Sequence, residues 1–168
     1  PGSGKTRALT HRMGYLVHQG VPPAAILGIT FTRAAAQEMK ARLAQLVPPA
    51  MARGVRLFTF HGLAWRILTD IQGRPNVLDE RAQKAMAGQL LRESGLNADQ
   101  TAVDGLLTDF AFFVGAQVPL ERFRPGSCDP GRFRRIWARY GELKAERGQV
   151  DFDDLIVQAS ALLRGNPR

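Results

Sequence analysis

The stretch Gly2-Ser3-Gly4-Lys5-Thr6 follows Pro1 and decides the expected fold. A glycine-rich turn followed by lysine and a hydroxyl residue is the second half of a Walker A phosphate loop. Its glycines let backbone N–H groups curl around phosphate oxygens, the lysine neutralises the β- and γ-phosphates, and the threonine hydroxyl binds Mg²⁺. We therefore expect these five residues to bind ATP, with Lys5 and Thr6 in catalytic roles and Thr6 as the Mg²⁺ ligand.

The two ends of the sequence predict that it is a piece of a longer protein. A phosphate loop normally follows a buried strand, whereas this loop starts at residue 1. The other end, Gly165-Asn166-Pro167-Arg168, stops a helix without a closing strand. We expect the chain to be cut on both sides.

The residues after the loop alternate between helical and strand patterns. Leu9, Met13, Leu16 and Val17 form one apolar helical stripe that stops at Gly20. Further along, we expect strands at 26–31 and 55–60 and helices at 33–47 and 61–71. Short apolar strands that alternate with helices are typical of a parallel α/β sheet.

From Gln72 onward the pattern changes, because no further strand-like run follows. Four segments carry helical periodicity, at 79–94, 98–116, 131–147 and 151–164. The sequence therefore predicts a helical insertion in, or appendage on, an α/β nucleotide-binding domain.

Composition limits the class of protein. With 168 residues, 45% of them apolar, the chain can bury a core of its own. The excess of 23 Lys and Arg over 15 Asp and Glu, a net charge of +8, favours a polyanionic partner such as nucleic acid. Its single cysteine, Cys128, excludes a disulfide framework and favours a reducing, cytoplasmic setting. No apolar run is long enough for a membrane span.

Three motifs in order resemble the UvrD/PcrA/Rep-type superfamily-one helicases. The sequence TFTRAAAQEM at 30–39 resembles their motif Ia, and TFHGLAWRIL at 59–68 resembles motif Ib. The sequence DFDDLI at 151–156 is similar to the segment where that family leaves its helical insertion, called 1B. The resemblance implies an incomplete RecA-like P-loop NTPase sheet with an α-helical 1B insertion. Its implied domains are 1–73 (first part of domain 1A), 74–149 (1B) and 150–168 (return towards 1A).

What the family implies is ATP hydrolysis coupled to 3′-to-5′ movement along single-stranded DNA, opening duplex at junctions in repair or replication. In that family the Arg7 position lies near the nucleotide base. The Asp-Glu pair that completes Mg²⁺ binding would follow residue 168, so we expect the chain alone to hydrolyse no ATP at a useful rate.

The strand-end motifs also predict DNA contacts from their own chemistry, since ligands of open α/β sheets meet the carboxyl ends of the strands. Phe31 can stack on a base, while Thr32 and the start of the following helix can hold a phosphate. His61 can donate to a backbone phosphate, and Thr59 lies at the same junction between the predicted strand 55–60 and the helix that follows it. The family often has Asn-Lys where this chain has Arg33-Ala34, and Arg33 keeps a positive charge there.

Three alternatives stay open. A RecB/AddA-like helicase fused to a nuclease fits the same motifs. A small P-loop kinase would keep Lys5 and Thr6 but has no reason to carry the motifs at 30–39 and 59–68. A non-catalytic DNA-binding module would bind DNA without using Lys5.

Five polar residues favour structural interpretations. His11 and His18 lie two helical turns apart with no third ligand, so we do not expect a metal site. Asp151, Asp153 and Asp154 stand at a helix start, where acidic residues cap the helix and interact favourably with its dipole.

Aromatic and basic residues in the second half are harder to assign. The aromatic residues at helical spacing favour a core position: Trp65, Trp137 and Tyr140. Arginines lie largely off the apolar stripe of the predicted helix 131–147, at Arg132, Arg134, Arg135 and Arg139. They predict either a DNA-binding face or a solvated one.

Overall fold

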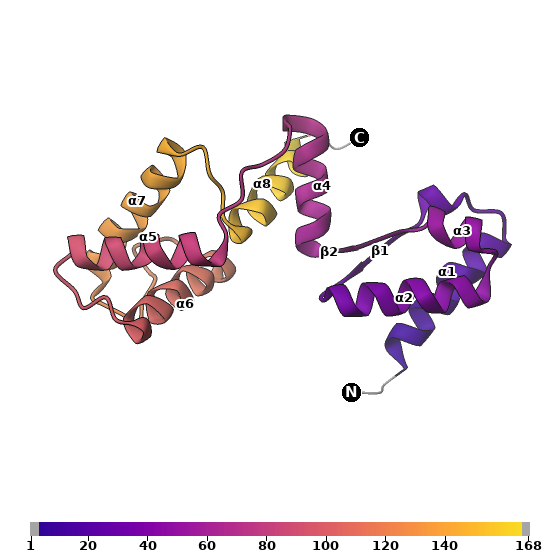
Figure 1. Ribbon diagram of the computed structural model, residues 1–168, viewed down its shortest axis with the longest axis horizontal. Helices are drawn as coiled ribbons and strands as arrows, with labels where there is room; N and C mark the ends of the chain where they lie inside the picture. The colour runs from indigo at the N-terminus through magenta and orange to yellow at the C-terminus, as the bar shows by residue number, and fades with distance from the viewer. Residues whose placement is uncertain (1–3, 166–168) are drawn as a thin grey trace. The chain divides into compact units, whose positions relative to one another are not determined.

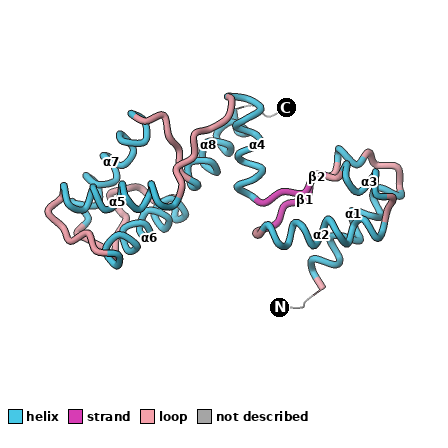
Figure 2. The backbone as a smooth tube through the Cα atoms, viewed as in Figure 1, coloured by secondary structure: helices cyan, strands magenta, loops and turns pink. Residues whose placement is uncertain are grey.

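The computed structural model describes residues 4–165, and the described chain is mostly helical with one two-stranded parallel sheet. It divides into two compact units at the boundary between Ile67 and Leu68. Figure 1 labels the helices and strands of both units, and Figure 2 colours the backbone by secondary structure.

The first unit contains the two strands. Its elements are α1 (Lys5–His18), a short 3₁₀ turn η1 (Pro23–Ala25), β1 (Leu27–Thr30), α2 (Arg33–Leu46), α3 (Pro49–Gly54), β2 (Arg56–Thr59) and the first part of α4 (Phe60–Gln72). The strands pair in parallel, with Leu27 opposite Arg56 and Thr30 opposite Thr59. The predicted strand–helix alternation is confirmed, whereas η1 and α3 were not expected. Both strands therefore end at the same edge, and each is followed at once by a helix.

Glycine at position 28 lets helix α1 approach the sheet closely. A Cβ atom at Gly28 would lie 2.5 Å from Met13 Cε of α1 and 2.5 Å from Leu57 Cδ2 of β2. Both side-chain tips would have to move for any larger residue. The core around this contact is formed by Met13, Val17, Ile26, Met39, Leu43, Val47, Ala52 and Val55. It fixes α1 and α2 relative to the strands.

The second unit is helical. After the end of α4 it contains α5 (Glu80–Glu93), α6 (Gln100–Ala116), α7 (Pro130–Glu146) and α8 (Phe152–Gly165). Asp79, Asp99 and Asp129 stand immediately before α5, α6 and α7, and each carboxylate accepts a hydrogen bond from a first-turn N–H. These caps explain why the predicted helices begin within two residues of their expected starts.

Aromatic rings fill the core of the second unit. Tyr140 is fully buried and its ring centroid lies 4.7 Å from that of Phe110, which also meets Trp137 edge-on at 5.0 Å. The core position predicted for Tyr140 and Trp137 is confirmed. Beside them, the buried carboxylate of Asp109 accepts hydrogen bonds from the backbone N–H groups of Gly126 and Ser127, and so ties down the loop before α7.

The chain enters and leaves the α5–α7 bundle through two segments that pair with each other. An isolated parallel bridge joins Val77 to Val150. The Leu78 N–H donates to the Val150 carbonyl at 2.8 Å, and the Val150 N–H donates to the Asn76 carbonyl at 2.9 Å. Entry and exit therefore lie side by side.

Removing the central aromatic ring should strongly destabilise this bundle. Phe133 is 1% exposed and packs against several other rings. We expect Phe133→Ala to lower the free energy of unfolding by about 3–5 kcal/mol, because the truncation leaves a cavity. Urea unfolding checks this, with Phe112→Ala as control, since Phe112 is 67% exposed on α6. Equal losses in the two variants would contradict the prediction.

Candidate functional site

The first turn of α1 has the features of an anion site. Gly4 is the residue before the helix and has a left-handed backbone, with φ 68° and ψ −4°. No side chain caps this end, and the first turn contains no acidic residue. The free N–H groups of the turn and the helix dipole therefore favour negative charge here. Gly2 and Ser3 lie outside the described residues.

The side chains of this turn differ in exposure. Lys5 and Arg7 are exposed, and Thr6 is half-buried. One turn later the buried hydroxyl of Thr10 donates to the Thr6 carbonyl at 2.8 Å. This bond helps to fix the backbone that carries Thr6.

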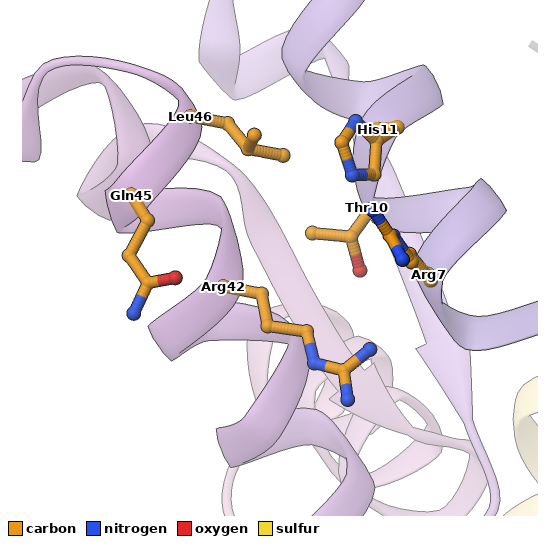
Figure 3. Close-up of a pocket in the computed structure, with 6 residues that line it drawn as sticks. All are labelled: Arg7, Thr10, His11, Arg42, Gln45 and Leu46. Carbon is orange, nitrogen blue, oxygen red and sulfur yellow. The ribbon is translucent and has the colours of Figure 1, made fainter. Parts of the chain in front are cut away.

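A pocket of about 330 Å³ lies between α1 and α2. Figure 3 shows its lining, in which α1 side chains face α2 side chains: Arg7, Thr10, His11, Arg42, Gln45 and Leu46. The Arg42 guanidinium pairs with Glu38 on its own helix. The sequence interpretation named only Arg7 as a ligand-binding residue here. The spacing of Arg7, Thr10 and His11, which puts them on one helix face, could have indicated Thr10 and His11.

The carboxyl edge of the strand pair carries the predicted DNA-binding residues. Phe31 follows β1 and is 86% exposed, so its ring packs little against the protein. Thr32 caps α2, its hydroxyl accepting from the Ala35 N–H at 3.1 Å. Thr59 does the same for α4, accepting from the Gly62 N–H at 3.1 Å. His61 lies in the first turn of α4 and is half-buried.

These two capped helix starts make one edge that suits phosphate groups. Thr30 and Thr59 are direct partners at the end of the register, so the residues that follow both strands begin from the same edge. Each capping hydroxyl accepts one hydrogen bond and keeps its own proton to donate. Arg33, the first residue of α2, is exposed and adds positive charge. The edge therefore combines hydroxyl donors, helix N-termini, a cation and an exposed ring.

Residues 1–168 match the UvrD/REP helicase N-terminal domain along the whole chain.

The chain belongs to the UvrD/REP helicase family.

Three relatives illustrate the similarity. The chain is 32% identical over 176 residues to the ATP-dependent DNA helicase PcrA of Leuconostoc citreum, covering 99% of this chain and 23% of that protein. It is 30% identical over 179 residues to DNA helicase II of Escherichia coli, covering 99% and 24%. It is 32% identical over 165 residues to PcrA of Bacillus subtilis, covering 93% and 22%. The chain thus spans less than a quarter of each of these relatives.

In this UvrD/REP family chain, ion pairs occupy part of the predicted basic face of α7. Arg132 pairs with Asp129, and Arg139 pairs with Glu142 and Glu146. Arg134 and Arg135 are exposed on the same helix. The face is therefore less positive than the arginine count suggests.

Two further residues discussed from the sequence, Asp151 and His18, make hydrogen bonds in the structure of this UvrD/REP family chain. The Asp151 carboxylate accepts from the Asp154 N–H at 2.8 Å, so the predicted capping at the start of α8 is confirmed for this pair. His18 Nδ1 donates to the Gly14 carbonyl at 2.9 Å.

Among residues 4–165 no group of three or more His, Cys, Asp or Glu side chains is arranged to hold a metal ion. No helix of the described chain is long and apolar enough to cross a membrane.

Proposed function

We propose that this chain is the ATP- and single-stranded-DNA-binding part of an ATP-dependent 3′-to-5′ DNA helicase that acts in repair or replication. Membership of the UvrD/REP family supports the proposal, as do relatives named as ATP-dependent DNA helicases. The structural observation that supports the proposal most is found within the first unit. An uncapped helix start with Lys5 and Thr6 lies in the same compact unit as a strand edge with an exposed Phe31.

In this proposal, residues Gly2 to Arg7 bind the nucleotide. The left-handed Gly4 and the first turn of α1, which contains no acidic residue and no side-chain cap, fit a phosphate group. Lys5 supplies a point charge to the β- and γ-phosphates, and Arg7 lies beside the base. Thr6 is the residue that would hold Mg²⁺, and when bound the ion offsets charge on the phosphate oxygens.

In the same proposal, DNA binds at the carboxyl edge of the strand pair. Phe31 stacks on a base, while Thr32, Arg33, Thr59 and His61 contact the backbone phosphates of a single strand or of a single-strand/duplex junction. Stacking and phosphate contacts together bind single strands without reading sequence. That property suits a motor that must move along any DNA.

In domain terms, we propose that 1–73 and 150–168 belong to a RecA-like domain 1A, and 74–149 to the helical 1B insertion. The observed sheet of two parallel strands would be part of the larger 1A sheet. A cytoplasmic location is part of the same proposal.

Three rival functions would use these residues differently. A RecB/AddA-like helicase would add nuclease activity to the same motor. A P-loop kinase or a passive DNA-binding module would leave either the strand edge or Lys5 without a role.

Strand separation by the full-length protein that carries this sequence tests the proposal. We expect release of a labelled strand from a duplex with a 3′ single-stranded tail, dependent on ATP and Mg²⁺, and little release from a 5′-tailed duplex. ATP hydrolysis unaffected by DNA, with no strand release from either substrate, would reject it.

His61 offers a test of the phosphate contacts. We expect His61→Ala to weaken single-stranded DNA binding severalfold. The slope of log affinity against log salt should become less steep, by at most about 0.7, the value for one lost contact between a fully charged group and a phosphate. Filter binding or fluorescence anisotropy over a salt series measures both quantities. His18→Ala is the matched control, because His18 is bonded within α1. An unchanged slope would assign His61 a structural role.

A further inference from the structure

A buried polar cluster lies where the chain leaves the second unit. The Lys144 ammonium of α7 donates to Asp151 Oδ2 at 2.7 Å and to Asp154 Oδ2 at 2.5 Å. The side chain of Lys144 is 8% exposed and that of Asp151 is 6% exposed. Lysine and aspartate are almost never buried to this extent without partners. The cluster therefore holds α7 and the start of α8 together through charge.

The cluster extends into the helical core. The Tyr140 hydroxyl donates to Asp151 Oδ2 at 2.9 Å, and Gln83 Nε2 of α5 donates to that hydroxyl at 3.1 Å. The Lys144 ammonium also lies 4.5 Å from the centroid of the Tyr140 ring. Three helices, α5, α7 and α8, thus share one set of polar contacts.

The same two aspartates also cap the start of α8, because each carboxylate accepts a hydrogen bond from the backbone N–H of the other residue. The Asp154 N–H donates to Asp151 Oδ1 at 2.8 Å, and the Asp151 N–H donates to Asp154 Oδ2 at 2.9 Å. This reciprocal pair has the pattern of a capping box, with aspartate in both positions. Residue 151 directly follows Val150, which pairs with the entry segment. The cluster is therefore adjacent to the point where entry and exit meet.

We propose that Lys144, Asp151 and Asp154 form a charge-dependent lock that holds the entry and exit segments of the helical unit together. Breaking the lock releases residues 76–78 and 149–151 and the start of α8, while the α5–α7 bundle stays folded. The lock gives this acidic segment a conformational role, and it holds whether or not the proposed function is correct.

The charges that face Asp151 keep the lock closed at neutral pH. Burial disfavours its ionised form, but the Lys144 ammonium, the Asp154 N–H and the Tyr140 hydroxyl outweigh burial and lower the pKa of Asp151 below its usual value. Burial and the charge of Asp151 raise the pKa of Tyr140, which stays a neutral donor. Because the pKa of Asp151 is lowered on folding, its contribution is complete above about pH 4 and is lost as the pH falls further.

Hydrogen exchange on the full chain tests the lock directly. We expect Lys144→Met, which keeps most of the unbranched side chain but removes its charge, to speed amide exchange at Leu78 and Val150 about a hundredfold. The reason is that two carboxylates lose their buried counter-ion. Exchange at Leu90 and Leu106, in the cores of α5 and α6, should stay unchanged. Arg139→Met is the matched control, because it removes exposed ion pairs from the same helix.

Two further variants keep the test decisive. If Lys144→Met fails to fold, Asp154→Asn takes its place, because it changes a side chain that is 29% exposed. We expect Asp154→Asn to speed amide exchange at Val150 about tenfold. The pair Lys144→Met with Asp151→Asn should exchange more slowly at Val150 than Lys144→Met alone, because only the more exposed Asp154 carboxylate then lacks its counter-ion. Unchanged exchange at Leu78 and Val150, or equal acceleration at Leu90 and Leu106, would overturn the lock.

Discussion

Substituting Lys5 with alanine in the full-length protein is expected to reduce ATP turnover about a thousandfold. On the proposed mechanism this ammonium interacts with the charge of the transferring phosphate, and losing one such group costs on the order of a hundred- to a thousandfold in kcat. Lys5 is exposed in the first turn of α1, so the change should not affect folding. Steady-state ATPase assays at saturating single-stranded DNA measure the effect.

A second lysine distinguishes this loss from a general loss of charge. Lys40 is exposed on α2, and Lys40→Ala should retain near-normal turnover. Binding of single-stranded DNA by Lys5→Ala should stay close to that of the unaltered protein, because the lysine acts on the nucleotide. Near-normal ATP turnover in Lys5→Ala would refute the motor assignment.

The second large effect is expected at Phe31. A stacked aromatic ring contributes about 1–3 kcal/mol per base, so Phe31→Ala should weaken single-stranded DNA binding about tenfold or more. Since 86% of Phe31 is exposed, its removal should leave the thermal midpoint of unfolding nearly unchanged. Titration of fluorescent oligonucleotides and a thermal melt measure the two quantities.

Phe112 provides the control for ring loss. It is 67% exposed on α6, in the other unit, and Phe112→Ala should bind DNA as the unaltered protein does. If both variants lose affinity equally, base stacking on Phe31 is not the cause. If neither does, the strand edge is not a DNA-binding site.

The sequence predicted the long elements well, because periodicity and capping agree there. Helix α7 has an apolar stripe that includes Phe133 and Tyr140, and Asp129 stands at its start, so both signals define the same helix. The two strands were found because each is a short apolar run bounded by turns. Their parallel register follows from the helices that connect them.

Short elements and long-range contacts were not predictable in this way. Helix α3 has six residues and begins at the second proline of the Pro48-Pro49 pair, so it is too short to show a period. The bridge between Val77 and Val150 joins segments about seventy residues apart, and no local pattern marks either of them. The pairing of Asp151 with Lys144 is equally invisible locally, because it depends on where two helices meet.

The chemistry proposed for the site comes from residue types in the sequence, whereas the surroundings of those residues do not. The pattern at Lys5 and Thr6 predicts a phosphate-binding loop, and the polar residues after each strand predict a binding edge at the ends of the strands. The pocket residues Arg42 and Gln45 come from another helix, so only folding brings them opposite Arg7. Residue type indicates what a group can bind, and tertiary packing decides which groups share a ligand.

Arg33 has a thermodynamic consequence for the first unit. It is the only charged residue in the opening turn of α2, and a cation at that end repels the helix dipole. A bound anion at the same turn offsets this repulsion. If the strand edge binds DNA as proposed, linkage therefore predicts that DNA raises the melting temperature of this unit, and that the gain declines as added salt screens the charges.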